Sequence, residues 1–113
     1  MKSIGVFLSS LTPKLNLDND LDILAGFISE SKLKLVYGGG KRGLMGKLSE
    51  KVSKKNGRIK GITLPMFDNE EIKPNYLDEE EVQTNFYLRK KSLIDQSDFF
   101  VVAWWSWHSR RIF

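Results

Sequence analysis

The chain alternates two patterns of apolar residues, one typical of buried strands and the other typical of amphipathic helices. Runs of consecutive apolar residues predict strands at residues 3–8, 33–37, 58–64 and 98–103. Apolar residues spaced three or four positions apart predict helices at residues 20–31, 44–55 and 85–96. Residues 79–84 suggest one more short strand. This order indicates an α/β fold with parallel strands joined by right-handed crossovers.

Polar residues mark the expected ends of two helices. Asp18 or Asn19 could cap the first helix, because short polar side chains accept hydrogen bonds from the first N–H groups. Asn56 and Gly57 are a signal for the end of the second helix, since both residue types tolerate the left-handed conformation found there. The last strand, at residues 98–103, is continuously apolar and is therefore expected to be buried.

The segment 37–46 (YGGGKRGLMG) carries the clearest chemical signal in the chain, because half of it is glycine. It connects a predicted strand to a predicted helix, and its glycines are Gly38, Gly39, Gly40, Gly43 and Gly46. Glycines allow the backbone to approach an anion, and a helix start presents N–H groups and a partial positive charge. Phosphate or nucleotide binding is the favoured interpretation, and a tight turn without a ligand is the alternative.

Composition narrows the class of protein. The chain has 113 residues, of which 41% are hydrophobic and 28% charged, as expected for one globular domain. The net charge of +4 is spread along the chain, which suits an anionic small molecule and gives no reason to predict a nucleic-acid partner. Cysteine is absent, so thiolate chemistry is excluded. The apolar run near the N-terminus is too short for a membrane span, and we predict a cytoplasmic protein without a membrane partner.

The chain resembles the Lonely-Guy family. Its members are cytokinin riboside 5′-monophosphate phosphoribohydrolases that were long described as possible lysine decarboxylases. Segment 37–46 resembles the family's YGGGxxGLMG block, and residues 4–10, 61–72 and 85–94 are weaker matches. The resemblance extends over residues 4–102. It implies a Rossmann-like parallel sheet with flanking helices, usually in a homodimer. It also implies hydrolysis of the N-glycosidic bond of a nucleoside 5′-monophosphate, giving free base and ribose 5-phosphate; we predict no cofactor.

The resemblance also implies roles for individual residues. Arg89 would be catalytic, Lys90 and Glu71 would contact the substrate, and the glycines of segment 37–46 would form the wall beside the phosphate. Ser9 and Ser10 follow the first strand and could give hydroxyls to the ligand, or could simply cap a turn. Without the resemblance, the basic cluster that begins at Arg89 would be interpreted as a solvated helix face.

The sequence departs from the family after the last predicted strand. The family has PGGxGTxxE there, which supplies a second glycine turn and the catalytic glutamate, whereas residues 103–113 read AWWSWHSRRIF. Tryptophan has a single codon, TGG, and reading this stretch one base later permits PGGVGTLDE. We therefore predict that residues 1–102 form an incomplete nucleotide-binding domain whose C-terminal elements are missing. Residues 103–113 would be an out-of-frame tail.

Three functions remain open from the sequence. The chain is a phosphoribohydrolase by family that is itself inactive, a non-catalytic nucleotide- or phosphate-binding protein, or a fragment without function. His108 has no second histidine or cysteine with which to share a metal, so no metal site is predicted.

Overall fold

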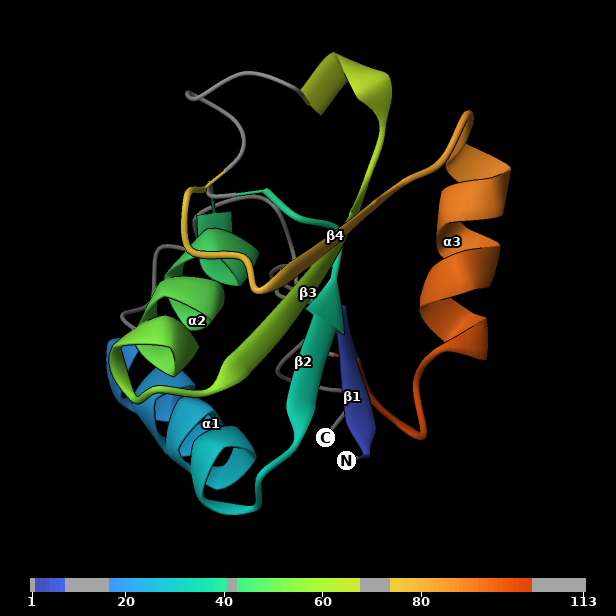
Figure 1. The fold of residues 1–113 in the computed structure, drawn as a ribbon. Helices are drawn as coiled ribbons and strands as arrows, with labels where there is room; N and C mark the ends of the chain where they lie inside the picture. Colours follow the sequence, from blue (N-terminus) through green and yellow to red (C-terminus); the bar gives the residue numbers. More distant parts are fainter. Residues whose placement is uncertain (1, 8–16, 41–42, 68–73, 103–113) are drawn as a thin grey trace, which may run out of the picture.

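The computed structural model describes residues 2–7, 17–40, 43–67 and 74–102. These residues form a five-stranded sheet in which all neighbouring strands are parallel, in the order β4-β3-β2-β1-β5 (Figure 1). The strands are β1 (Ser3–Phe7), β2 (Lys34–Tyr37), β3 (Arg58–Thr63), β4 (Glu79–Val82) and β5 (Phe99–Val102). The helices are α1 (Asp18–Glu30), α2 (Gly43–Lys54) and α3 (Phe86–Asp95), with a 3₁₀ turn η1 (Pro65–Phe67) after β3. The predicted α/β fold is thus confirmed.

Helices α1 and α2 cover one face of the sheet, and the main core lies beneath them (Figure 1). Most of the apolar residues whose spacing predicted these helices are buried, and Leu24 of α1 is partly buried. The buried ones are Leu21, Ala25, Ile28, Leu44, Leu48 and Val52. They pack against Ile4, Leu35 and Ile59 of the three central strands. The apolar faces of the two helices and the sheet thus form one continuous core.

The opposite face is covered by α3, which buries much less. Leu93 is the buried residue of α3, and it packs with Val36, Ile62 and the partly buried Phe7. Parallel sheets usually carry apolar side chains on both faces. Here the half-covered face also carries polar residues on β2, β3 and β4, namely Lys34, Lys60, Glu79 and Glu81. Helix α3 therefore buries fewer apolar residues than α1 or α2.

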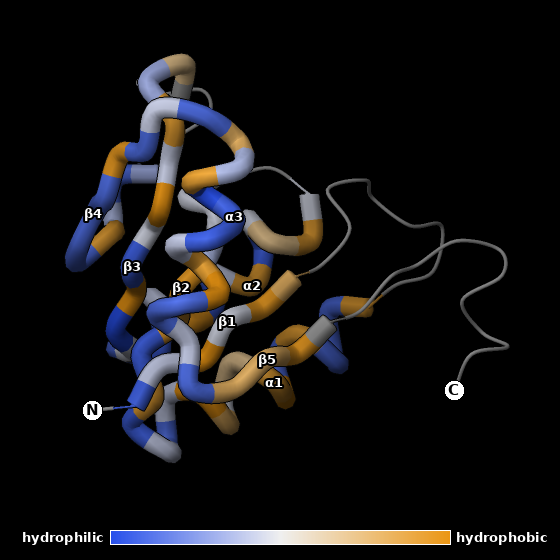
Figure 2. Tube along the Cα trace, turned by 90° about the vertical axis from the view of Figure 1, so that its right-hand side faces the viewer, coloured by the Kyte–Doolittle hydropathy of each residue, from blue (hydrophilic) through white to orange (hydrophobic). Residues whose placement is uncertain are grey.

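The expectation that the last strand is buried was wrong. Phe99 and Phe100 of β5 are 46% and 44% exposed, because β5 is an edge strand of the described sheet and pairs there with β1 alone (Figure 2). The two rings lie on opposite faces. Phe100 stacks on Phe7 with ring centroids 5.8 Å apart, and the Lys2 ammonium lies 5.5 Å from the centre of the Phe99 ring.

Helix ends followed the expectations only in part. Leu17 occupies the N-cap of α1 and makes no side-chain cap, whereas Asp18 and Asp20 lie in the first turn, where negative charge is favourable. The predicted caps Asp18 and Asn19 were therefore wrong. After α2, Asn56 adopts the left-handed conformation (φ 62°), as its position suggested. None of the described helices is long and apolar enough to cross a membrane.

We expect Leu48→Ala to lower the free energy of unfolding by about 2–5 kcal/mol, because it leaves a cavity under α2. Ile23→Ala is the matched control, since Ile23 lies on the outer side of α1 and is 65% exposed. Its effect should stay below about 1 kcal/mol. Urea unfolding followed by far-UV circular dichroism measures both variants, and equal losses would contradict this position of the core.

Candidate functional site

The glycine turn begins at the carboxyl end of β2 and passes close to β3. Gly39 has a φ of +80°, which side chains rarely tolerate, and an added Cβ would lie 2.3 Å from the methyl group of Thr63. On β3, a Cβ added to Gly61 would lie 3.0 Å from the Cα of Gly39. A glycine in the turn and a glycine on β3 thus let the two backbones approach each other. Gly43, at the start of α2, also has a positive φ of 68°.

Hydroxyl groups make hydrogen bonds in this turn and in the helix that follows it. The Tyr37 hydroxyl donates to the Gly40 carbonyl at 2.9 Å, and Ser49 Oγ donates to the Gly46 carbonyl at 3.0 Å. Ser49 Oγ also shares a hydrogen bond of 2.6 Å with the Tyr76 hydroxyl. Burial raises the pKa of Tyr37, so its phenol stays neutral and keeps its proton for Gly40. The turn is therefore tied to β2 through Tyr37, and Ser49 links the first turns of α2 to Tyr76.

Arg89 extends from α3 to the same place. Its Nε donates to the Ile62 carbonyl at 2.8 Å, and its Nη2 donates to the Gly38 carbonyl at 2.8 Å. A Cβ on Gly38 would lie 1.9 Å from that Nη2, so a larger residue there would displace the guanidinium from this position. Burial lowers the pKa of Arg89, yet a guanidinium remains protonated in proteins. A permanent positive charge is thus held at the carboxyl ends of β2 and β3.

The structure brings together some of the residues predicted for the site. Arg89 contacts Gly38 directly, and Gly39 and Gly40 follow within the same turn. Gly46 is buried in α2 and accepts a hydrogen bond there, while Lys90 is exposed on α3. Ser9, Ser10, Glu71 and the tail at residues 103–113 lie outside the described residues, and their roles stay predictions.

Sequence reasoning missed several residues that shape the turn. Gly61 had a usable signal, since a glycine inside a predicted strand often marks a close approach of backbones. Ser49 and Tyr76 had none, because they are 27 positions apart and their contact depends on the tertiary fold. Across residues 2–7, 17–40, 43–67 and 74–102, no group of three histidine, cysteine or acidic residues is placed to hold a metal ion.

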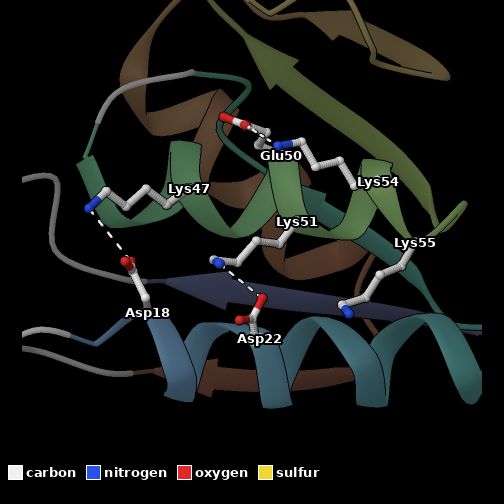
Figure 3. A pocket seen from close by; sticks show the side chains of 7 residues that line it. All are labelled: Asp18, Asp22, Lys47, Glu50, Lys51, Lys54 and Lys55. Atoms are coloured by element: carbon white, nitrogen blue, oxygen red, sulfur yellow. Dashed lines mark hydrogen bonds and ion pairs between the residues drawn. The ribbon is translucent and has the colours of Figure 1, made fainter.

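A hollow of about 450 Å³ lies elsewhere, on the outer side of α1 and α2 (Figure 3). Its lining is charged, and most of the charges pair with each other. Lys51 Nζ lies 2.9 Å from Asp22, Lys47 Nζ lies 3.7 Å from Asp18, and Lys54 Nζ lies 2.9 Å from Glu50. The hydrogen bond from Lys51 lowers the pKa of Asp22. We interpret this surface as a solvated layer of ion pairs between two helices, not as the ligand site.

Comparison with known proteins shows the fold and goes no further. No protein-family model matches the sequence, and no curated protein matches it. A structural-genomics structure of TM1055 is 23% identical, with a TM-score of 0.72 over 91% of this chain and 61% of its own. A molybdenum cofactor binding protein from the phototrophic bacterium Rippkaea orientalis is 20% identical, with a TM-score of 0.76 over 96% and 66%. The molybdenum cofactor carrier protein from Chlamydomonas reinhardtii is 21% identical, with a TM-score of 0.71 over 90% and 62%.

The chain is therefore a Rossmann-like α/β protein, and it spans less than two thirds of the length of these three structures. At such identities the likeness establishes a shared arrangement of helices and strands. Function has to be argued from the site itself.

We expect Gly39→Ala to lower the free energy of unfolding by more than about 1 kcal/mol, because a left-handed residue with a Cβ is strained and the new methyl would collide with Thr63. Gly26→Ala is the matched control. Gly26 lies within α1, and nothing stands within 4 Å of its added Cβ, so this change should stabilise the protein by about 0.5–1 kcal/mol. Chemical denaturation measures the free energy of unfolding of both variants. A Gly39→Ala variant as stable as the wild type would contradict the geometry of the turn.

Proposed function

We propose that the chain binds the phosphate of a nucleoside 5′-monophosphate at the glycine turn, in the manner of the Lonely-Guy phosphoribohydrolases that its sequence resembles. The observation that carries this proposal is the hydrogen bond from Arg89 to Gly38, which holds a guanidinium against the turn. Ligands of open α/β sheets collect at the carboxyl ends of the strands. A phosphate would be attracted there by the guanidinium and by backbone N–H groups of the turn and of the start of α2.

We further propose that this chain binds its ligand without cleaving it. Breaking an N-glycosidic bond through an oxocarbenium-like transition state needs a carboxylate beside the ribose. The family motif that supplies this glutamate is replaced by residues 103–113, which contain no carboxylate side chain. Nε and Nη2 of Arg89 donate to backbone carbonyls, and this favours a role in shaping the turn over one in proton transfer.

A carrier of an anionic cofactor is the second candidate. It is favoured by two of the similar structures, which are described as a molybdenum cofactor binding protein and a molybdenum cofactor carrier protein. A carrier needs the same anion-holding turn and no glutamate. AMP binding that is strong and depends on the base supports the first candidate, whereas binding of inorganic phosphate as tight as that of AMP supports the second. The homodimer implied by the family stays a prediction.

We expect Arg89→Ala to weaken the binding of AMP at least tenfold, because a charge-assisted contact to phosphate is worth about 1.5–3 kcal/mol. Lys91→Ala is the matched control. It removes the same charge from the same helix, but Lys91 pairs with Asp95 at 3.0 Å on the outer side. Isothermal titration calorimetry with AMP, and with adenosine as the ligand that lacks phosphate, measures the difference.

Turnover is tested separately by chromatography of adenine after incubation with AMP. We expect none. Release of adenine by the 113-residue chain would contradict binding without hydrolysis, and equal AMP affinity in the Arg89 and Lys91 variants would contradict the position of the phosphate site.

A further inference from the structure

We propose that Glu81 is a positioning residue: its carboxylate holds α3 on the sheet in the one placement that lets Arg89 contact the glycine turn. The importance of this placement for ligand binding rests on the proposed function. The placement itself is a property of the unliganded protein and can be measured without any ligand.

Apolar packing alone fixes α3 only loosely. Leu93 is its buried residue, whereas Phe86, Tyr87, Leu88 and Ile94 are exposed. A helix held by one buried side chain can rotate or slide at little cost, because burial is not directional. Arg89, by contrast, must reach two particular carbonyls on two strands, at 2.8 Å each. Some directional contact has to set the rotation and height of the helix.

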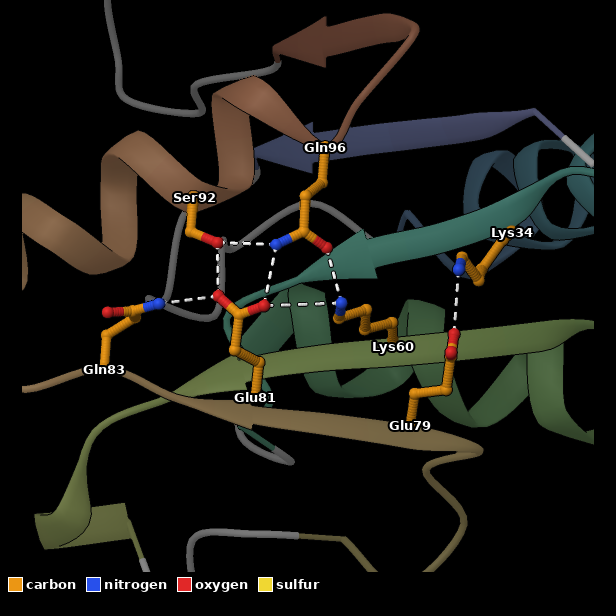
Figure 4. Close-up of polar contacts among 7 residues, drawn as sticks. All are labelled: Lys34, Lys60, Glu79, Glu81, Gln83, Ser92 and Gln96. Carbon is orange, nitrogen blue, oxygen red and sulfur yellow. Dashed lines mark hydrogen bonds and ion pairs between the residues drawn. The ribbon is translucent and has the colours of Figure 1, made fainter.

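The carboxylate of Glu81 on β4 supplies that contact (Figure 4). It accepts hydrogen bonds from Ser92 Oγ and, at 2.8 Å, from Gln96 Nε2, both on α3 or at its C-cap. Gln83 Nε2 donates to it at 2.7 Å, and Lys60 Nζ on β3 lies 3.4 Å away. Lys60 also donates to Gln96 Oε1 at 2.5 Å. One carboxylate thus joins β3, β4 and α3.

Arg89 lies on the same face of α3 as the residues that donate hydrogen bonds to Glu81. Arg89, Ser92 and Gln96 follow the i, i+3, i+7 spacing, which places them on one face of a helix. Fixing Ser92 and Gln96 therefore fixes the direction in which Arg89 leaves the helix. The hydrogen bonds, that from Ser92 foremost, lower the pKa of Glu81 to about 2, so the carboxylate is charged at any ordinary assay pH.

We expect Glu81→Gln to speed hydrogen exchange of the Arg89 side-chain Nε–H at least tenfold, measured by NMR on the unliganded protein and assigned with Arg89→Lys. An amide presents an NH₂ group where the carboxylate accepted, so it faces at least one donor with another donor. Glu79→Gln is the matched control: Glu79 lies on the same strand and the same face, but its carboxylate pairs with Lys34 on β2 at 2.8 Å. That variant should keep the wild-type exchange rate.

Local loosening has to be separated from general instability. The backbone amide of Leu48, in α2 on the other face, serves as the internal reference and should exchange at an unchanged rate in Glu81→Gln. If Glu81→Gln does not fold, Ser92→Ala removes one donor to the carboxylate and should also speed exchange at Arg89. Exchange at Arg89 that stays at the wild-type rate in a folded variant, or that rises equally in Glu79→Gln, would overturn the proposal.

The AMP titration then links positioning to binding. Glu81→Gln should weaken AMP binding in the wild-type background and leave it unchanged in the Arg89→Ala background, because its effect passes through Arg89. An equal loss in both backgrounds would overturn this coupling. Absence of AMP binding by the wild-type protein would contradict the proposed function alone, since the exchange measurement needs no ligand.

Discussion

The Arg89 side chain joins elements that are far apart in the sequence. From α3 it reaches the carbonyl of Gly38 after β2 and that of Ile62 on β3. Strand ends in a parallel sheet leave carbonyl groups that need donors, and a half-buried carbonyl without one costs free energy. Arg89 satisfies two of them with one planar group. The turn, the strand ends and the third helix consequently depend on each other, and the basic cluster on α3 is not merely a solvated face.

The unequal faces of the sheet explain why this connection is polar. On the α1 and α2 side, apolar side chains from two helices and three strands close into one core. On the other side, α3 has a small apolar contact around Leu93, and lysines and glutamates occupy several of the other positions on β2, β3 and β4. Position on this side is therefore set by directional hydrogen bonds. Such contacts specify geometry well, although each contributes only about 1 kcal/mol or somewhat more when charged.

Periodicity was enough to predict the strands, the helices and their parallel pairing. Consecutive apolar residues at Leu35 and Val36 mark a strand buried on both faces, and the spacing of Leu44, Leu48 and Val52 marks a helix face. The exposure of Phe99 and Phe100 was not predictable in the same way, because an edge strand and a central strand can share one apolar run. The start of α1 at Leu17 was not predictable from polar residues either. A helix can begin without a side-chain cap when its first turn carries acidic residues.

The glycines of segment 37–46 serve packing as well as any ligand. Gly38 is explained by the approach of Arg89, and Gly39 by its left-handed backbone and the nearness of Thr63. Packing alone thus accounts for two of the three consecutive glycines, so the number of glycines by itself is weak evidence for a ligand. Packing does not require that the hydrogen-bond donor at this turn carry a permanent charge. A neutral donor could satisfy the same carbonyls, and the choice of a guanidinium at the carboxyl edge of the sheet is the feature that favours an anionic ligand.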